Sequence, residues 1–251
     1  EGMKDGLRYP DACNQALQFI LNKEVRTPND LLGLSYVKEV VHHHYPISMH
    51  CIKRTNDYHA KDIEQISSAT SLRIALKQGK DVAHQLPGYE TYKDSHFFTL
   101  EEFYPYLKYL ITFTPLEGLH MIEEGLDDRL YKVNQETYSL EELINSLTSK
   151  RYTRSRIQRM LIHILLHNTK EEIKKAMDID YIHILGLSTK GQRYIKTAKK
   201  NTEYKIITNI TKHKHPALDI EKRGAQLLDL VDPGFFKETI KAIPYRKIDL
   251  K

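Results

Sequence analysis

A group of hydroxyl side chains and one arginine lie together where a helical pattern begins. The residues are Ser67, Ser68, Thr70 and Arg73. The first turn of a helix leaves backbone N–H groups without partners and carries partial positive charge, so hydroxyls and a guanidinium there can complete a phosphate site. Capping of the helix is the more common use of Ser and Thr at such a position. The sequence therefore predicts a capped helix start, with phosphate binding as the chemistry that it could support.

A second group of residues suited to phosphate lies before and within a helix predicted over 153–168. Five cations and one tyrosine occupy ten consecutive positions, at the end of the helix where its dipole favours anions. Further cations recur at helical spacing near 190–200, with the acidic Glu203 after them. Each group by itself could be a solvated helix face. The predicted nucleic-acid contacts are Lys150, Arg151, Tyr152, Arg154, Arg156 and Arg159 in the first group, and Arg193, Lys196, Lys199 and Lys200 in the second, which Lys190 precedes.

Charge is distributed unevenly along the chain. Residues 150–251 contain 23 Lys and Arg against 11 Asp and Glu, a net charge of +12, whereas residues 1–149 contain 15 against 22, a net charge of −7. A segment with such an excess attracts polyanions. A membrane surface is the competing partner, but the basic residues do not follow one long amphipathic helix with an aromatic opposite face. The pattern therefore predicts a nucleic acid as the partner of residues 150–251.

The histidine and acidic clusters show no metal-ligand spacing. His42, His43 and His44 are consecutive, and a lysine separates His213 from His215. Neither group has Cys or acidic partners at matching positions, so both are expected to be surface histidines. The acidic run over 123–128 is expected to form a solvated turn, because a local run rarely supplies converging oxygens to a hard cation. No metal ligands are predicted.

The composition is that of a globular chain. It has 251 residues, of which 40% are hydrophobic and 28% charged, enough for a substantial core and one or two domains. No apolar run approaches the roughly 20 residues that span a bilayer, and the N-terminus lacks the layout of a signal peptide. Cys13 and Cys51 are expected to be buried free thiols. The chain is expected to be soluble and cytoplasmic, with no membrane or protein partner.

The elements that would position these residues are mixed at first and mainly helical later. The early part predicts helices over 5–22, 28–41 and 71–78 and a strand over 47–52. The pattern dissolves between 85 and 99, where we expect a domain boundary. Later helices are predicted near 100–114, 116–124, 139–148, 153–168, 170–176, 190–200 and 217–231, and strands near 181–185 and 204–208.

The order of several segments resembles the bacterial tRNA(Met) cytidine acetate ligase family. These segments read PNDLLGLSYV over 28–37, IKRTNDYH over 52–59 and ISSATSLR over 66–73, and those over 150–159 and 181–187 also resemble family segments. The catalytic domain of that family resembles the HxGH-type nucleotidylyltransferases, in which the element aligned with ISSATSLR lies beside the phosphates of the nucleotide. The resemblance covers most of the chain.

One large departure concerns the start of the sequence. The family opens with a strand and an EYNPFHNGH-like loop, and the sequence from Glu1 to Pro10 contains nothing of that kind. His42 to His44 do not replace it, since they lack the glycine and a preceding apolar strand. We therefore expect the HxGH portion to be missing from this chain, its catalytic residues to be unknown, and the chain alone to be inactive.

The resemblance implies a fold, a reaction and a set of contacts. The implied fold is α/β and mostly helical, with residues 1–85 as the C-terminal part of a Rossmann-like, ATP-binding nucleotidylyltransferase domain and residues 98–251 as a mainly helical basic domain that binds tRNA. The implied enzyme is an ATP-dependent ligase that activates acetate as acetyl-adenylate and acetylates the exocyclic amine of the wobble cytidine in elongator tRNA(Met), with ATP as substrate and Mg²⁺ accompanying it. The implied ATP contacts are Asn29, Arg54, Ser67, Ser68, Thr70 and Arg73.

Two other functions stay open at the level of sequence. In a non-catalytic RNA-binding module, the basic segment alone would have a function and the α/β part would be a scaffold. Another nucleotidylyltransferase would make a dinucleotide cofactor from a small substrate, but such a substrate gives no reason for a segment with a net charge of +12.

Overall fold

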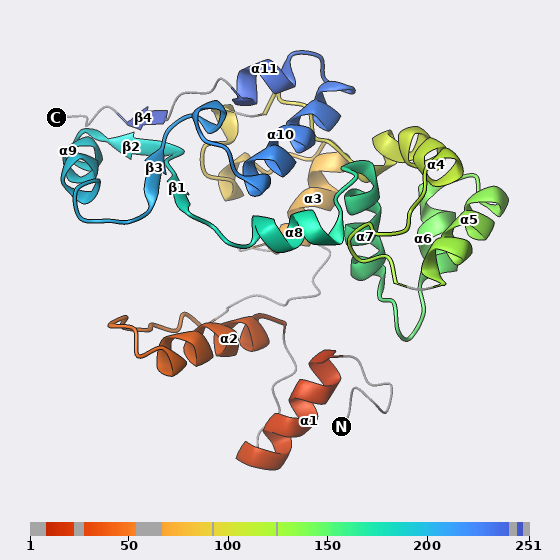
Figure 1. Cartoon of the computed structure of the whole chain (residues 1–251), viewed down its shortest axis with the longest axis horizontal. Helices are drawn as coiled ribbons and strands as arrows, with labels where there is room; N and C mark the ends of the chain where they lie inside the picture. The colour runs from red at the N-terminus through yellow and green to blue at the C-terminus, as the bar shows by residue number, and fades with distance from the viewer. Residues whose placement is uncertain are drawn as a thin grey trace. The chain divides into compact units, whose positions relative to one another are not determined.

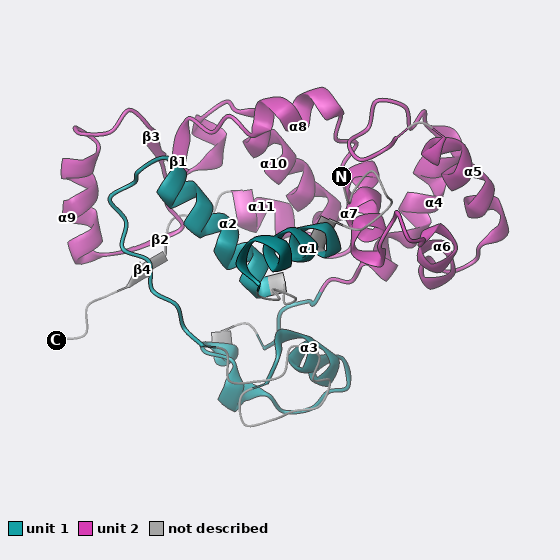
Figure 2. Cartoon of the chain, turned by 90° about the horizontal axis from the view of Figure 1, so that it is seen from below, with its two compact units in different colours: residues 1–97 teal, residues 98–251 magenta. Residues whose placement is uncertain are grey.

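The chain divides into two compact units, residues 1–97 and residues 98–251 (Figure 2). The computed structural model describes residues 9–22, 28–53, 67–91, 93–123, 125–240 and 245–247. Figure 1 labels the helices and strands used below.

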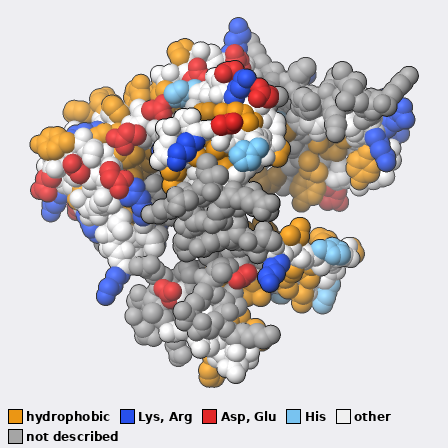
Figure 3. All heavy atoms as spheres, turned by 180° about the vertical axis from the view of Figure 1, so that it is seen from behind, with side chains coloured by type: hydrophobic (Ala, Val, Ile, Leu, Met, Phe, Trp, Pro, Cys, Tyr) orange, Lys and Arg blue, Asp and Glu red, His pale blue; other side chains and the backbone are white. Residues whose placement is uncertain are grey.

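Unit 1 consists of helices and short turns. It contains α1 (Tyr9–Leu21), α2 (Pro28–His42), α3 (Ala69–Lys77) and the 3₁₀ turns η1 (Ala83–Gln85) and η2 (Tyr89–Thr91). The three predicted helices are confirmed, and Pro28 occupies the first position of α2, where its missing N–H costs nothing. Helices α1 and α2 carry exposed apolar side chains, with Phe19 at 91% exposure, and Figure 3 shows hydrophobic and histidine side chains side by side on the surface of α2.

Two predictions for unit 1 are wrong. Residues 47–52 are not a strand but an irregular segment, in which Ile47 and Ile52 are 57% and 96% exposed. Alternation of apolar residues forms a strand only where a neighbour supplies hydrogen bonds, and the described residues of unit 1 contain no strand. Cys51 is exposed and Cys13 is half-buried, so neither is a buried thiol.

The first half of unit 2 is a helical bundle around one hydrophobic core. It contains η3 (Leu100–Phe103), α4 (Tyr104–Phe113), α5 (Leu126–Glu136), α6 (Leu140–Leu147), α7 (Arg154–Leu165) and α8 (Lys170–Ala176). Leu107, Leu130, Leu143, Leu147 and Leu161 are fully buried in this core. The helices predicted near 100–114, 139–148, 153–168 and 170–176 are confirmed.

The segment before α5 differs from its prediction. Residues 116–122 form turns rather than a helix, because Gly118 and Met121 have positive φ and the backbone bonds to the segment after α7. His120 N donates to Asn168 O at 2.8 Å, and Lys170 N donates to Gly118 O at 2.9 Å. The acidic run expected as a turn instead leads into α5, whose first turn contains Asp127 and Asp128, where the helix dipole favours carboxylates.

The second half of unit 2 combines short parallel strands with helices. Strand β1 (Tyr181–His183) pairs in parallel with β3 (Lys205–Ile207), and β2 (Gly186–Ser188) pairs in parallel with β4 (Tyr245–Lys247). Between and after them lie α9 (Thr189–Ala198), η4 (Ile210–Lys212), α10 (Pro216–Asp229) and α11 (Phe235–Ile240). Leu227, Leu228 and Val231 pack against the core of the bundle. The fold is a helix-rich α/β fold, as predicted.

Candidate nucleotide and nucleic-acid sites

Ser68 begins the helix that the hydroxyl-rich stretch predicts. It is the N-cap residue of α3, with φ −74° and ψ 156°. Its Oγ accepts a hydrogen bond from Ser71 N at 3.1 Å, and the Ser71 hydroxyl donates to Ser68 O at 2.9 Å. Both side chains are buried. These two hydroxyls are therefore used in capping, the more common of the two roles expected for them.

Thr70 and Arg73 are the exposed members of the predicted phosphate group. Because they are three residues apart on one helix, they share a face, and a hydroxyl and a guanidinium can meet the same anion. Ser67 is half-buried, and its N–H donates to Gln85 Oε1 at 2.8 Å. The structure therefore divides the four predicted residues into two that fix the turn, Ser67 and Ser68, and two that are exposed, Thr70 and Arg73.

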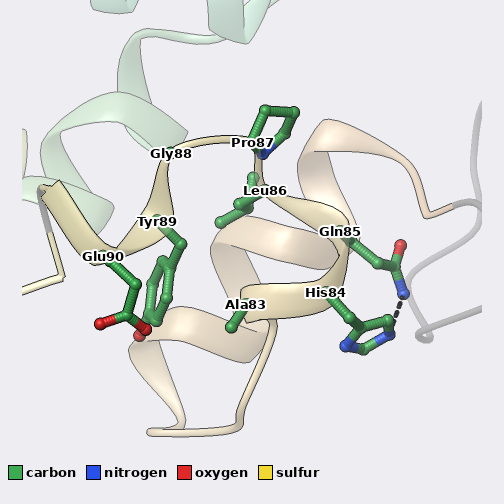
Figure 4. A pocket seen from close by; sticks show the side chains of 8 residues that line it. All are labelled: Ala83, His84, Gln85, Leu86, Pro87, Gly88, Tyr89 and Glu90. Carbon is green, nitrogen blue, oxygen red and sulfur yellow. Dashed lines mark hydrogen bonds between the residues drawn. The ribbon is translucent and has the colours of Figure 1, made fainter. Parts of the chain in front are cut away.

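The segment that contains Gln85, the hydrogen-bond partner of Ser67, also lines a hollow. Residues 83–90, a continuous segment that includes η1 and the start of η2, line this hollow (Figure 4). Gln85 bonds Ser67 through Oε1, and its Nε2 lies 3.1 Å from His84 Nε2. The eight lining residues include the carboxylate of Glu90 and no Lys or Arg. The hollow is therefore unsuited to phosphate, and this segment positions the turn before α3.

Of the other two predicted ATP contacts, Asn29 lies within the described residues. Asn29 is the second residue of α2 and is exposed, and no described contact joins it to α3. Arg54 lies outside the described residues.

Helix α7 holds the first basic group as the sequence predicts. Thr153 is its N-cap, and its hydroxyl accepts a hydrogen bond from Arg156 N at 3.4 Å. One face of the helix is an apolar stripe at helical spacing whose members are all buried, namely Ile157, Met160, Leu161, Ile164 and Leu165. Burial of this stripe leaves the arginines on other faces of the helix.

Glu123 joins three residues of the first basic group. Its Oε2 accepts hydrogen bonds from Arg151 Nη2 at 2.9 Å and from the Tyr152 hydroxyl at 3.1 Å, and its Oε1 pairs with Arg156 Nη2. The two guanidinium carbons lie 5.4 Å and 5.0 Å from the centroid of the Tyr152 ring. We call these four residues the Glu123 cluster. Tyr152 is buried, so its ring orients arginines and is not available for a base to stack on.

The electrostatics of the Glu123 cluster follow from these contacts. Burial raises the pKa of Glu123, but the hydrogen bond from Tyr152 and the positive charges of Arg156 and Arg151 outweigh it, so the pKa lies below its ordinary value. Burial and the hydrogen bond to Glu123 raise the pKa of Tyr152. At neutral pH the carboxylate is ionised and the phenol is neutral, which leaves two guanidiniums against one carboxylate.

Arg154 uses more of its guanidinium donors in hydrogen bonds within the chain than Arg151 or Arg156 does. Its Nη1 donates to Glu141 Oε1 at 2.8 Å and to Asn145 Oδ1 at 3.1 Å, and its Nη2 donates to Glu141 Oε2 at 2.5 Å. Such a bidentate pair occupies the face of the guanidinium that phosphate would take. Among the described residues, Arg151 and Arg156 each use one Nη group on a carboxylate and keep further donors.

The remaining cations of the first group are exposed. Lys150 and Arg159 have no ion-pair partner within the described part of the chain. Arg159 also lies near His163, whose pKa is lowered by burial and by the charges of His120 and Arg159. His163 is therefore neutral at physiological pH, and Asn168 Nδ2 lies 3.0 Å from its Nδ1.

Helix α9 carries the second basic group on its surface. Ser188 caps the helix by accepting a hydrogen bond from Gly191 N at 3.1 Å. All five cations are exposed, and none forms an ion pair with another described residue; they are Lys190, Arg193, Lys196, Lys199 and Lys200. This group therefore keeps its charge available, whereas carboxylates partly neutralise the first group.

The prediction for His213 and His215 is wrong, because both are buried. His213 Nε2 lies 2.8 Å from Asp180 Oδ1, and His215 Nε2 lies 2.8 Å from Asp178 O. His215 also caps α10 by accepting the Ala217 N–H at 3.1 Å. Sequence spacing missed this because the partners are more than thirty residues away. His42, His43 and His44 are exposed, as predicted.

Comparison with known proteins gives matches along nearly the whole chain. A family model described as HIGH Nucleotidyl Transferase matches residues 1–241. The tRNA(Met) cytidine acetate ligase of Geobacillus sp. (strain WCH70) is 34% identical over 245 residues, 90% of this chain and 61% of that protein. The protein of the same name from Bacillus subtilis (strain 168) is 32% identical over 256 residues, 92% of this chain and 61% of that protein. The chain spans about three fifths of the length of these two relatives.

Two solved structures share the fold. The apo form I crystal structure of Thermotoga maritima TmcAL matches with a TM-score of 0.80 and 21% identity, covering 98% of this chain and 69% of that one. The form II structure bound with alpha-thio ATP matches with a TM-score of 0.76 and 22% identity, covering 98% and 68%. These matches confirm the predicted fold class.

Proposed function

Because this chain belongs to the HIGH nucleotidyl transferase family, we propose that it serves in an ATP-dependent ligase that acetylates a cytidine of tRNA(Met). The observation that carries the proposal is the 32–34% identity to two proteins of that name over about nine tenths of this chain. The ATP analogue bound to Thermotoga maritima TmcAL supports ATP as a substrate.

The proposed reaction has two steps. An acetate oxygen forms a bond to the α-phosphorus of ATP, the bond to the bridging oxygen of the β-phosphate breaks, and pyrophosphate leaves. The exocyclic amine of the cytidine then attacks the acetyl carbonyl, AMP leaves with the bonding electron pair, and the amine loses a proton. Acetate is a poor acyl donor until AMP makes it a good one, so the task of the protein is mainly to position the reactants and neutralise charge.

Unit 1 contains the groups that would neutralise the phosphates. Thr70 and Arg73 are exposed on one face of α3, and Thr70 lies in the first turn, where the helix dipole is positive. Ser67 and Ser68 would act by fixing the turn through Gln85 and Ser71. Asn29 and Arg54 remain proposed ATP contacts from the family resemblance.

Mg²⁺ would accompany the nucleotide rather than occupy a site built from protein side chains. No group of three or more His, Cys, Asp or Glu side chains among the described residues could hold a metal ion. Mg²⁺ commonly binds through substrate phosphates and keeps several waters, so ATP itself can hold the ion.

The basic residues of unit 2 would hold the tRNA. Their exposed cations can contact phosphates, which fix the position of an RNA without reading its sequence. No described helix is long and apolar enough to cross a bilayer. We propose tRNA as the partner of this surface and the cytoplasm, where tRNA is found, as the location.

A direct test measures transfer of labelled acetate from acetate and ATP to a tRNA(Met) transcript. The assay uses this chain and, in parallel, this chain preceded by an HxGH-type segment of the kind that the family resemblance implies. We expect acetylcytidine with the extended protein and none with a transcript carrying uridine at the wobble position. Failure of the extended protein to acetylate, together with intact tRNA binding, would support the RNA-binding module instead. ATP turnover with a small nucleotide-accepting substrate would support the third alternative.

A further inference from the structure

Two adjoining hollows lie beside helix α9, and they differ in chemistry. The first has a volume of about 530 Å³ and is mostly apolar. The second is basic, with Arg193, Lys196, Gln192 and two threonines in its lining. Leu187 and Ile195 line both hollows, so these two side chains form the wall between them.

The apolar hollow has one flat aromatic wall. Tyr194 lines it and is 72% exposed, so its side chain is accessible to a ligand. Ile182, 44% exposed, and Ile206 contribute aliphatic surface from β1 and β3. Asn201 and Thr202, on the loop between α9 and β3, add an amide and a hydroxyl to the lining. The hollow therefore combines an aromatic surface with a few hydrogen-bonding groups.

The charged residues of α9 all have one sign. Five exposed cations belong to α9 and the turn that follows it, and the described acidic residue nearest in sequence is Glu203. An apolar hollow that adjoins a second hollow lined by Arg193 and Lys196 suits a ligand that has a flat apolar part and an anionic part.

We propose that the apolar hollow beside α9 binds one unstacked RNA base on the ring of Tyr194, while Arg193 and Lys196 contact the flanking phosphates. The proposal rests on the proposed RNA partner and adds a base-binding site to it. Unpaired bases stack on aromatic side chains, and a basic groove follows the backbone. The hollow is large enough for a nucleobase, and Asn201 can donate to or accept from a base edge.

The test uses the whole chain and an RNA hairpin whose loop carries 2-aminopurine, a base that loses fluorescence on stacking. The chain contains no Trp, so the signal of the base is easily isolated. We expect binding to quench the fluorescence. Tyr194→Ala should abolish the quenching and weaken binding about tenfold, whereas Tyr194→Phe should retain both. Tyr194 is exposed, so its truncation leaves the core intact.

Control variants separate this proposal from the RNA-binding role. Tyr131→Ala, on α5 beside acidic residues, should bind and quench like the wild type. Arg193→Ala with Lys196→Ala should weaken binding and reduce its salt dependence. If these two substitutions weaken binding but Tyr194→Ala leaves affinity and quenching unchanged, α9 contacts phosphates only and the base site is refuted. If the chain binds no RNA, the proposed function fails as well.

Discussion

At the scale of single residues, the arginines of the first basic group are not equivalent. Both Nη groups of Arg154 are used on Glu141, whereas Arg156 uses one on Glu123 and keeps further donors. We predict that Arg156→Ala weakens tRNA binding and lowers the slope of log affinity against log salt by about one, while Arg154→Ala changes both little. Filter binding across a salt series measures this. Equal effects of the two substitutions would contradict it.

Glu123 gives a residue-scale prediction of pH dependence. A carboxyl whose folded-state pKa is lowered contributes stability above its unfolded pKa of about 4.3, and that stability is lost as pH falls through the lower folded value. Glu123→Gln should therefore lower the melting temperature at pH 6.5, and the difference from the wild type should shrink towards pH 3. Thermal denaturation at several pH values measures it, with Glu136→Gln on α5 as control. A difference in melting temperature between Glu123→Gln and the wild type that stays constant across pH would contradict this role for the ionised Glu123.

At the scale of elements, different residues at helix α3 are predicted to serve in capping and in binding. Ser68→Ala removes the acceptor of the Ser71 N–H and should lower the free energy of unfolding by about 0.5–2 kcal/mol. Arg73→Ala should leave stability nearly unchanged but weaken ATP binding, because an exposed guanidinium can meet phosphate. Urea denaturation and calorimetric titration of ATP measure the two effects. The reverse pattern would mean that α3 is not a phosphate site.

The elements also show what sequence can predict. The stripe from Ile157 to Leu165 and the caps at Ser68 and Thr153 follow from spacing and residue type, since both depend on neighbours within one helical turn. The Glu123 cluster joins residues 28–33 positions apart, and the burial of His213 depends on Asp180 at a similar distance. Local patterns contain no information about such pairs.

At the scale of the whole molecule, charge predicts different salt dependence for the two ligands. Residues 150–251 have a net charge of +12, and tRNA contacts there would release one counterion for each phosphate neutralised, so tRNA affinity should fall steeply with salt. ATP would meet only the few groups at α3, in the part of the chain with net charge −7, and its affinity should fall much less.

Titrating the whole chain with tRNA and with ATP between 50 and about 300 mM salt tests this difference. Arg156→Ala combined with Arg159→Ala should reduce the tRNA slope by about two and leave the ATP slope unchanged, because both residues lie on α7 in unit 2. Lys199→Glu with Lys200→Glu should reduce the tRNA slope further if the RNA also follows α9. A tRNA affinity that does not depend on salt would mean that both basic groups are solvated helix faces and do not contact the RNA phosphates.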